Sequence, residues 1–393
     1  MNLKISFAPT SIGLSLLLTI ILISSCGDSG NKPPKKIFVR PDETEAVREF
    51  KTDSFSKGSC IQVLNNGNIV VVSHDYPSIP VTSYTPDGKI VWQQKITMPG
   101  DTVFASCVTL TQDGNIVVGG NVGFNDKQRG FICAVGVNGN ILWQKKLTCN
   151  NVNTTTCLSN GDLALEINTS GLDVMRIKAD GTELWQNMYG DPSVYITQHI
   201  FALKNNGILL SGYGTIDTGG KQGLQFTYIN SDGSTKWTKK YNDTGLDIET
   251  PLAMYEDANH CFHIWGECIE SKLLKEGVRY MKMDANGNLL ANTNKFWEDD
   301  ASLCKAAVVT KEGKFYIIGD LQNFRVSYRM FLACSDTTGK LLWTRSVGKD
   351  QCMSGGDDLA ILNGQIVTLS YKCSGAYVSF FPLDGGKATK SNY

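Results

Sequence analysis

The chain has 393 residues, of which 41% are hydrophobic and 19% are charged, and this composition excludes disordered and collagen-like proteins. Its 37 Lys and Arg residues balance 38 Asp and Glu residues, so the net charge of −1 gives no electrostatic reason to expect a nucleic-acid partner. Length alone suggests two or three domains of about 150 residues, but a repeat architecture can make one domain much longer, so repeats decide the question.

The N-terminal segment has the features of a signal peptide. Lys4 provides a positive charge, and an apolar stretch of 12 residues from Ile12 to Ile23 follows it. This stretch is too short to span a hydrocarbon core of about 30 Å as a helix. It ends in Ile23-Ser24-Ser25-Cys26, which resembles the lipobox of bacterial lipoproteins, where the Cys is lipidated and becomes the mature N-terminus. Residues 1–25 are therefore expected to be a lipoprotein signal peptide, with an ordinary secretory signal as the alternative.

Residues 26–36 are expected to contain the lipidated Cys26 and a flexible tether, because the segment is polar and includes Pro33-Pro34. Two or three acyl chains on one Cys anchor a protein stably without crossing the membrane. An Asp directly after the lipidated Cys is an inner-membrane retention signal in some bacteria, and here Gly27 occupies that place. The resemblance thus implies a lipid-anchored protein of the bacterial cell envelope, with the outer membrane favoured.

Turn dipeptides divide residues 37–393 into seven units. Asn-Gly and Asp-Gly are strong β-hairpin signals, because a type I′ turn needs a positive φ at both central residues. The chain contains eleven of these dipeptides, and all of them fall on two interleaved series with intervals of 42 to 54 residues. The first series comprises Gly67, Gly114, Gly161, Gly207, His260, Gly313 and Gly364, and the second comprises Gly88, Gly139, Gly181, Gly233, Gly287, Gly339 and Gly385.

Each unit is expected to form four short antiparallel strands, since β-branched runs such as Ile69 to Val72 follow the first turn. A unit of this size cannot bury both faces alone, and radial stacking around a channel solves that problem. The sequence therefore predicts an all-β fold, a seven-bladed β-propeller preceded by the signal peptide and short tether. A segment within Lys36 to Phe50, such as Ile37-Phe38-Val39, is a candidate for the outermost strand of the last blade.

A tryptophan recurs at one position of the repeat. Five of the seven Trp residues lie four residues after the second-turn glycine, namely Trp92, Trp143, Trp185, Trp237 and Trp343. Identical placement in five units favours packing between blades over an aromatic ligand platform. The fifth and seventh units have Ala291 and Thr389 at this place, so we expect those two blades to diverge.

Two of these segments permit a comparison with a known family. Asn138-Gly139-Asn140-Ile141-Leu142-Trp143 and Thr338-Gly339-Lys340-Leu341-Leu342-Trp343 are similar to the Gly-x-x-x-Trp core of PQQ-type propeller repeats in exported bacterial proteins. The resemblance covers most of residues 55–385 and implies the fold rather than an activity. Quinoprotein dehydrogenases of this kind are usually eight-bladed and carry a vicinal Cys-Cys pair, whereas this chain has seven units and no adjacent cysteines. The chain is also similar in size and anchor to the eight-bladed scaffold lipoprotein of the outer-membrane β-barrel assembly machine.

Few residues have the spacing of a catalytic or metal site. The sequence contains no Walker loop and no G-x-S-x-G, H-E-x-x-H or C-x-x-C-H segment, so no catalytic residue, metal site or cofactor is predicted. The cluster His260-Cys261-Phe262-His263 has metal-ligand residue types, but its histidines point to opposite faces of a strand, and we interpret it as structural. Cys60 and Cys107 share one repeat position and are expected in the core, whereas Cys149 and Cys157 are the best local disulfide candidates.

The long connections are expected on the face opposite the hairpin turns, and long loops on a rigid scaffold commonly carry binding residues. Those between second and third strands are expected at Gly119 to Gly130, Gly212 to Gln225, Gly266 to Tyr280 and Gly319 to Met330. Aspartates on connections between blades form an expected acidic zone near the channel, comprising Asp101, Asp191, Asp243, Asp299 and Asp350. A basic and aromatic rim is expected around it, comprising Arg129, Arg279, Arg325, Tyr328 and Arg329.

These residues are candidates for a face that binds an envelope protein or a polar or carbohydrate ligand, and solvated loop charges with turn-forming Asp are the alternative. We expect a non-catalytic binding or scaffold protein. An envelope enzyme acting on carbohydrate or a small molecule would require two carboxylates about 5–10 Å apart at the channel mouth. A quinone-cofactor redox propeller would require a deep Trp-lined pocket with a metal carboxylate beside it.

Overall fold

The computed structural model describes residues 38–39, 42–52, 58–123, 128–168, 172–189, 195–215, 222–241, 248–270, 275–297, 301–323, 327–347, 355–372 and 375–386. The compact unit that contains them begins at Ile37. The predicted signal peptide, Cys26 and the tether lie outside the described residues. Among the residues that are described, no helix is long and apolar enough to cross a lipid bilayer.

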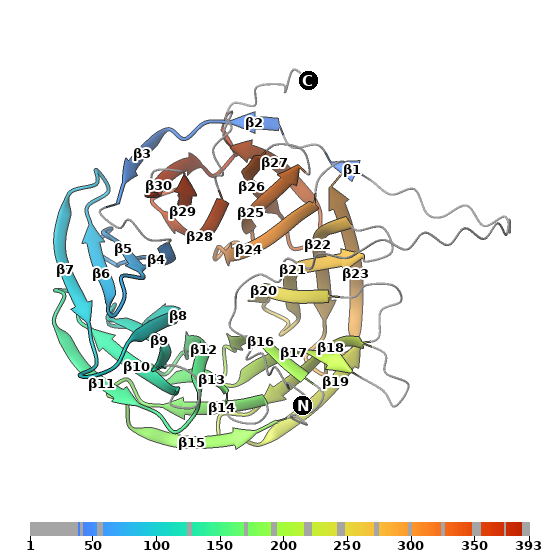
Figure 1. The fold of residues 1–393 in the computed structure, drawn as a ribbon. Coiled ribbons are helices and arrows are strands. Elements are labelled where there is room, and N and C mark those ends of the chain that lie inside the picture. The colour runs from blue at the N-terminus through green and yellow to red at the C-terminus, as the bar shows by residue number, and fades with distance from the viewer. Residues whose placement is uncertain are drawn as a thin grey trace, which may run out of the picture. The chain divides into compact units, whose positions relative to one another are not determined.

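The seven-bladed β-propeller predicted from the sequence is confirmed (Figure 1). Each blade contains four antiparallel strands that follow one another from the centre of the ring outward. Blade 1 comprises β4 (Gly58–Val63), β5 (Ile69–Ser73), β6 (Ile79–Tyr84) and β7 (Ile90–Ile96), and blade 2 comprises β8 (Val103–Leu110), β9 (Ile116–Val122), β10 (Arg129–Val135) and β11 (Ile141–Lys146). Blade 3 comprises β12 (Asn151–Cys157), β13 (Leu163–Asn168), β14 (Leu172–Ile177) and β15 (Glu183–Met188), and blade 4 comprises β16 (Tyr195–Ala202), β17 (Ile208–Thr215), β18 (Gln222–Ile229) and β19 (Thr235–Tyr241).

The last three blades also include strands from the N-terminal part of the propeller. Blade 5 comprises β20 (Ile248–Glu256), β21 (Phe262–Glu270), β22 (Lys275–Met283) and β23 (Leu289–Trp297), with β1 (Phe38–Val39) as a fifth strand. Blade 6 comprises β24 (Ala301–Val309), β25 (Phe315–Asn323), β26 (Ser327–Ser335) and β27 (Leu341–Val347), with β2 (Asp42–Thr44) as a fifth strand. Blade 7 comprises β28 (Gly355–Leu362), β29 (Gln365–Lys372), β30 (Gly375–Pro382) and β3 (Arg48–Lys51).

The strands β1, β2 and β3 form an N-terminal strap along the outside of blades 5, 6 and 7 (Figure 1). β1 and β2 pair in parallel with β23 and β27, whereas β3 pairs antiparallel with β30. The ring therefore closes through β3, and the example Ile37-Phe38-Val39 is wrong as the closing strand. Phe38 and Val39 pair with blade 5, and the chain passes blade 6 before it reaches blade 7.

Most hairpin turns differ from the type I′ turn that the dipeptides suggested. At the first turn of blade 1, Gly67 N donates to Leu64 O and Leu64 N donates to Asn68 O, so that only Gly67 needs a positive φ, here 83°. This geometry is a type I turn followed by a G1 bulge. The type I′ prediction holds at Asn363-Gly364, where both φ values are positive.

The bulged turn also explains the two irregular members of the first series. His260 and Asn206 occupy the left-handed position of their turns, with φ values of 58° and 64°. In blade 4 the residue equivalent to the turn glycine is therefore Asn206 and not Gly207. A single residue with positive φ is easier for a non-glycine side chain to supply than two in succession.

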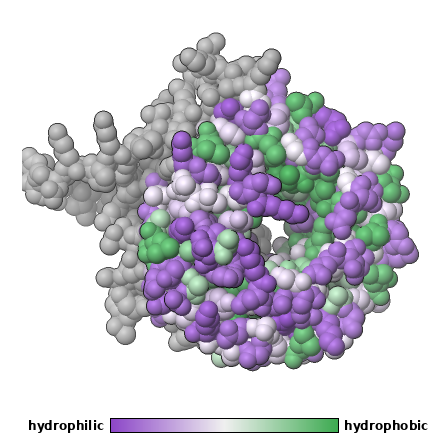
Figure 2. Space-filling view, turned by 180° about the vertical axis from the view of Figure 1, so that it is seen from behind, coloured by the Kyte–Doolittle hydropathy of each residue, from purple (hydrophilic) through white to green (hydrophobic). Residues whose placement is uncertain are grey.

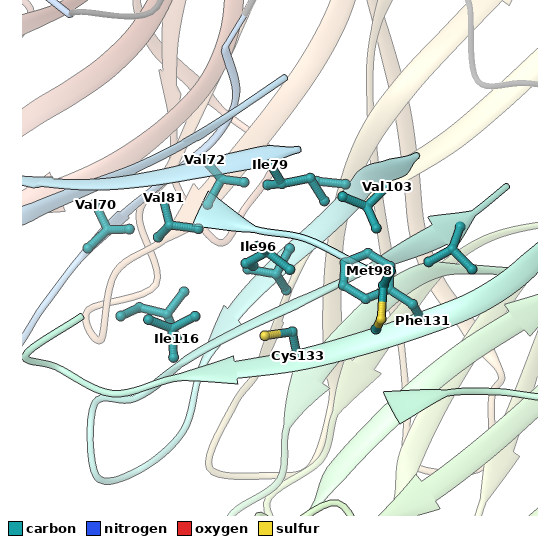
Figure 3. Close-up of a cluster of buried hydrophobic side chains, with 14 of the residues drawn as sticks. Val70, Val72, Ile79, Val81, Ile96, Met98, Val103, Ile116, Phe131 and Cys133 are labelled. Carbon is teal, nitrogen blue, oxygen red and sulfur yellow. The ribbon is translucent and has the colours of Figure 1, made fainter. Parts of the chain in front are cut away.

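Hydrophobic clusters fill the spaces between neighbouring blades. All five residues of β5 are buried, and its four apolar residues alternate between two clusters. Val70 and Val72 pack with Ile116 and Phe131 of blade 2, as Figure 3 shows. Ile69 and Val71 belong to the cluster shared with blade 7. The two faces of a middle strand thus bury their side chains against different blades, as expected for radially stacked sheets.

The recurring tryptophans pack at the outer part of the junctions between neighbouring blades. Trp92 lies over Gly139 of the next blade, where an added Cβ would come within 2.8 Å of the indole. Its Nε1 also donates to Val137 O at 2.9 Å, two residues before that glycine. The same indole-to-carbonyl bond joins Trp143 to Ala179, Trp185 to Ser231 and Trp237 to Ala285. Trp343 likewise lies over Gly385.

The two blades expected to diverge use other aromatic residues at this place. In blade 5, which has Ala291 at the tryptophan position, Tyr280 of β22 lies over Gly339. At the junction of blades 7 and 1, Phe50 of β3 lies over Gly88. Thr389 lies outside the described residues. The close approach over the second-turn glycine is therefore kept at every junction, while the residue and the strand that supply it change.

Candidate functional site

Seven innermost strands surround the central opening of the ring: β4, β8, β12, β16, β20, β24 and β28 (Figure 1). Figure 2 shows this opening in space-filling view, with hydrophilic residues on much of its rim. Each innermost strand contains a β-bulge, because one residue is skipped in its pairing with the second strand. The skipped residues are Ser59, Ser106, Asn153, Gln198, Leu252, Lys305 and Asp357.

We call these seven positions the bulge ring. Bulges re-aim side chains and are common beside active sites and binding sites. All but Leu252 are polar, and the described side chains of the ring are half-buried. The bulge ring is therefore the candidate site that the fold itself places on the channel wall.

Polar groups behind the bulge ring hold its side chains. Asn153 Nδ2 donates to Glu166 Oε1 at 2.8 Å, and Glu166 is only 1% exposed. Lys305 Nζ lies 4.0 Å from Asp320 Oδ2 on the neighbouring strand. Ser106 Oγ donates to an Asn151 oxygen at 3.3 Å. Hydroxyl, amide and ammonium groups held in this way suit the binding of a polar ligand or ordered water.

Carboxylates of one blade bind the innermost strand of the next blade. Asp358 Oδ2 accepts a hydrogen bond from Ile61 N at 2.8 Å, between blades 7 and 1. Asp320 and Glu267, which lie on the second strands β25 and β21, accept bonds from Gly356 N at 2.9 Å and from Cys304 N at 3.0 Å in the next blade. Each of these bonds satisfies a backbone donor of an innermost strand. Burial raises the pKa of Asp358 to about 7.

Asp257, His263 and Tyr280 form a hydrogen-bonded chain in blade 5. His263 Nε2 lies 3.1 Å from Asp257 Oδ2, and His263 Nδ1 lies 2.9 Å from the Tyr280 hydroxyl. These residue types also occur in catalytic proton relays. Here, however, the phenol donates to Thr337 O of blade 6, and His263 is 3% exposed. This hydrogen-bonded chain therefore connects blade 5 to blade 6. Within the described residues, no group of His, Cys, Asp and Glu is placed to hold a metal.

Arg176 has a similar role between blades 3 and 4. Its guanidinium donates to Asp162 Oδ2 at 2.7 Å and 3.0 Å within blade 3. It also donates to Asn206 O at 3.1 Å and to Ser231 O at 2.7 Å in the two turns of blade 4. A buried charge is stabilised when it is paired and its donors are bonded, and both conditions hold here.

Six candidates from the sequence lie outside the described residues: Cys26, Asp191, Asp243, Asp299, Asp350 and Arg325. Of the expected acidic zone, Asp101 is therefore the member that is described. Its Oδ2 lies 2.5 Å from Nζ of Lys146, on the outermost strand β11. The ion pair therefore joins Asp101 to the outermost strand of blade 2.

The expected rim position of Arg279 is wrong. Arg279 lies inside β22, is 3% exposed, and donates from Nε to Asn292 Oδ1 at 3.0 Å. The reason is strand length, because β21 continues to Glu270 and β22 begins at Lys275, within the expected loop from Gly266 to Tyr280. A small pocket of about 10 Å³, room for about one water molecule, lies beside Arg279, and it is lined by Leu224, Thr250, Pro251, Ile264, Gly266, Glu267, Arg279 and Met281.

The other rim candidates also belong to strands. Arg129 is the first residue of β10 and is exposed, with Nη1 donating to Gln128 O at 2.8 Å. Tyr328 and Arg329 lie in β26 and pair with Gln322 and Leu321. Polar residues can extend a hairpin in this way, because the antiparallel ladder is made by the backbone. Arg129 and Arg329 belong to blades 2 and 6, so the described structure does not bring the candidates together.

The cysteines of the described residues are structural in character. Cys149 and Cys157 are free, so the disulfide considered between them is not formed. Burial raises the pKa of Cys133 to about 12 and that of Cys149 to about 11, and it also raises the pKa of Cys107. These thiols stay protonated at neutral pH, whereas a nucleophilic cysteine requires a lowered pKa.

The bulge ring and the carboxylate contacts were not found from the sequence. Counting back eight residues from the left-handed turn residue reaches Ser59, Ser106, Asn153, Gln198, Leu252 and Lys305. The polar character of this repeat position was therefore available as a signal. The carboxylates Glu267 and Asp320 also share a position, seven residues after His260 and Gly313.

The comparisons with known proteins identify a fold and no family. No family model and no curated protein matches the sequence. Virginiamycin B lyase from Staphylococcus aureus matches with a TM-score of 0.56 at 12% identity, covering 85% of this chain and 98% of that one. The WD40 β-propeller domain of Doa1 gives 0.55 at 13%, covering 85% and 95%, and the Dos1 propeller gives 0.53 at 10%, covering 85% and 80%. At these identities the chain is similar to other β-propellers in fold alone.

Proposed function

We propose that this protein is a non-catalytic binding or scaffold propeller of the bacterial cell envelope, tethered through a lipid on Cys26. The observation that carries the proposal is that titratable side chains in the described structure bind groups across the junctions between blades. The described clusters around Asp358, Arg176 and His263 all connect neighbouring blades. Groups that bind each other across blades make the ring rigid, and a rigid ring presents its loops and edges as a fixed binding surface.

The lipoprotein part of the proposal depends on the segment ending in Cys26. We expect a fatty-acid analogue to label the protein in a bacterial host, and the protein to sediment with the outer membrane. Cys26→Ser should remove the label and release the chain from the membrane fraction. A labelled C26S chain, or an unlabelled wild type, contradicts the lipid anchor.

The scaffold part is tested on the full-length chain extracted in mild detergent. We expect an equimolar complex with a defined envelope protein, detected by native mass spectrometry. Lys305→Met and Asp357→Asn in the bulge ring should leave this complex intact, because a scaffold binds through its outer surface. Turnover of an envelope carbohydrate by the purified chain, abolished by either substitution, contradicts the proposal and favours an enzyme at the channel.

A further inference from the structure

An exposed tyrosine lies on the tight turn between β5 and β6 of blade 1. Tyr76 and Pro77 are the central residues of this turn, in which Asp75 N donates to Ser78 O at 3.1 Å and Ser78 N donates to Asp75 O at 2.8 Å. Pro77 O accepts a bond from Val103 N, the first residue of the innermost strand β8, at 3.2 Å. Val103 belongs to the buried cluster shown in Figure 3. Tyr76 is therefore held in a fixed place beside an innermost strand, although it is 63% exposed.

Two further rings lie against Tyr76. The ring of Phe104, on β8, lies 5.1 Å from it at an interplanar angle of 60°, and the ring of His74 lies 6.2 Å from it at 9°. Both arrangements belong to the geometries that aromatic pairs prefer. We call His74, Tyr76 and Phe104 the aromatic corner. It presents an ordered aromatic surface to solvent at the junction of blades 1 and 2.

A chain of hydrogen bonds begins two residues after Phe104. Ser106 Oγ donates to Asn151 Oδ1 at 3.3 Å, Asn151 Nδ2 donates to Asn153 Oδ1 at 2.5 Å, and Asn153 Nδ2 donates to Glu166 Oε1 at 2.8 Å. Glu166 is 1% exposed, and its carboxylate only accepts hydrogen bonds, so it fixes the orientation of both amides. The Ser106 hydroxyl therefore gives its proton to the chain, and its remaining lone pairs are acceptors for a ligand.

The aromatic corner and this polar chain meet on one stretch of β8. Phe104 and Ser106 are half-buried and alternate with buried residues, so they share the more accessible side of the strand, about 7 Å apart. The carboxylates on either side of this stretch in the sequence, Asp75 and Asp101, are paired with lysines at 3.4 Å and 2.5 Å. A ligand here meets an apolar ring next to neutral hydrogen-bonding groups.

We propose that the aromatic corner and the Ser106 chain bind a neutral saccharide, with one pyranose ring on Tyr76 and hydroxyl groups bonded to Ser106 and Asn151. A pyranose has an apolar C–H face that packs on an aromatic ring, and each of its hydroxyl groups both donates and accepts a hydrogen bond. The Asn151 amide matches such a hydroxyl, because one N–H and one lone pair remain beyond the bonds of the chain.

This site goes beyond the proposed scaffold function, because it needs no protein partner. The main alternative ligand is a quaternary ammonium ion, which aromatic faces also attract. Such a cation would use the rings and leave the hydrogen-bonding chain without a role. The two ligand classes therefore differ in whether Ser106 contributes to binding.

The experiment uses the full-length chain in a detergent without a sugar headgroup. Maltotriose and cellotriose are the neutral probes, and tetramethylammonium is the cationic probe. Calorimetry measures affinity at two salt concentrations, and saturation-transfer NMR identifies the ligand protons that touch the protein. Tyr76→Ala and Ser106→Ala are the test variants. Tyr76→Phe keeps the ring, and Met188→Ala removes a side chain that is 57% exposed on β15, far from the site in sequence.

We expect at least one trisaccharide to bind, with saturation strongest on the C–H protons of one ring face and with no dependence on salt. Tyr76→Ala should weaken binding about tenfold and Ser106→Ala about fivefold. Tyr76→Phe and Met188→Ala should each change the affinity less than about twofold. Equal melting temperatures of the variants exclude a folding defect as the cause.

Three results overturn the inference: no binding of either trisaccharide, equal binding by the wild type and Tyr76→Ala, and binding of tetramethylammonium at Tyr76 in place of a saccharide. If saccharide binding fails while the wild type still forms its complex with an envelope protein, this inference fails and the scaffold function stands. If the complex is also absent, the scaffold function fails as well.

Discussion

Two kinds of junction hold the ring of blades together. At five junctions, a tryptophan of the outermost strand covers the second-turn glycine of the next blade. Between blades 5 and 6 this glycine is covered by Tyr280, which comes from the third strand, and between blades 7 and 1 it is covered by Phe50, which comes from the strap. The comparison separates the contact that the fold needs from the residue that happens to supply it.

Tyr280 reproduces both halves of the tryptophan contact. Its ring lies over Gly339, and its hydroxyl donates to Thr337 O, the carbonyl two residues before that glycine. The indoles of Trp92 and Trp143 use the carbonyls at the same place. Phe50 has no donor and reproduces only the apolar half, while the inner end of the same junction has the bond from Ile61 N to Asp358. Junctions that look divergent in sequence thus keep the physical contact, in full at Tyr280 and in its apolar half at Phe50.

The largest effect is expected at the Tyr280 junction. Tyr280→Ala removes a ring that is fully buried and the bonds to His263 and Thr337. We expect the free energy of unfolding to fall by about 4 kcal/mol. Urea denaturation followed by tryptophan fluorescence measures the change.

Tyr280→Phe is the matched control for this site, because it keeps the ring and removes only the hydroxyl. It should cost about 1 kcal/mol. Equal losses for the two variants would mean that the hydroxyl network, rather than ring packing over Gly339, holds the junction.

A junction covered by a tryptophan should lose somewhat less stability when that residue is truncated, because the tryptophan is partly exposed. Trp143→Ala removes the indole over Gly181 and its bond to Ala179 O. We expect a loss of about 3 kcal/mol in the free energy of unfolding. Leu142, next to it, is 52% exposed, and Leu142→Ala should change stability by less than about 0.5 kcal/mol. Similar losses at both positions would show that Trp143 is a surface residue without a sealing role.

Of the three junctions compared, the closing junction between blades 7 and 1 should lose the least stability when its aromatic residue is truncated. Phe50→Ala removes the ring over Gly88 and its contacts with Tyr84 and Phe380. We expect a loss of about 2 kcal/mol in urea unfolding, because Phe50 is only half-buried. The exposed Val47 is the control, and Val47→Ala should have little effect. An unchanged stability in Phe50→Ala would mean that the strap is held by its backbone bonds alone.

The sequence predicted the parts of the fold that repeat locally. Turn residues with positive φ, such as Gly67 and Gly114, are required by the geometry of a single hairpin, so their spacing reveals the number of blades. The tryptophan register follows from the same spacing. Phe50 and Gly88 meet only because the ring closes, and Tyr280 replaces a tryptophan from another strand. Contacts of this kind depend on the tertiary arrangement, which no local pattern encodes.

The candidate site was predicted less well than the fold. The expected acidic zone and basic rim assumed that charged residues mark loops, but Arg279 lies in a strand and Asp101 is paired with Lys146. A charged residue tolerates a strand position when a neighbouring strand supplies a hydrogen bond, as Asn292 of β23 does for Arg279. The bulge ring depends on a skipped residue in the pairing of two strands, and this is a property of register that side-chain periodicity does not reveal.

The smallest expected effect concerns the inner end of the closing junction and depends on pH. Burial raises the pKa of Asp358 to about 7, whereas an Asp in an unfolded chain has a pKa of about 3.9. The folded chain therefore binds this proton more tightly than the unfolded chain. The contribution of neutral Asp358 to stability is fully present below about pH 4 and is lost as the pH rises through 7. Asp358→Asn removes this titration.

Relative to the wild type, the Asp358→Asn chain should gain about 1–2 kcal/mol of stability between pH 5 and pH 7. Urea unfolding at pH 5, 6, 7 and 8 measures the difference between the two curves. Asp180→Asn is the control, because hydrogen bonds from Thr182 lower the pKa of this exposed carboxyl and its titration lies below the tested range. Parallel curves for the wild type and Asp358→Asn would show that Asp358 is charged throughout, so that an ionised carboxylate binds Ile61 N and joins blade 7 to blade 1.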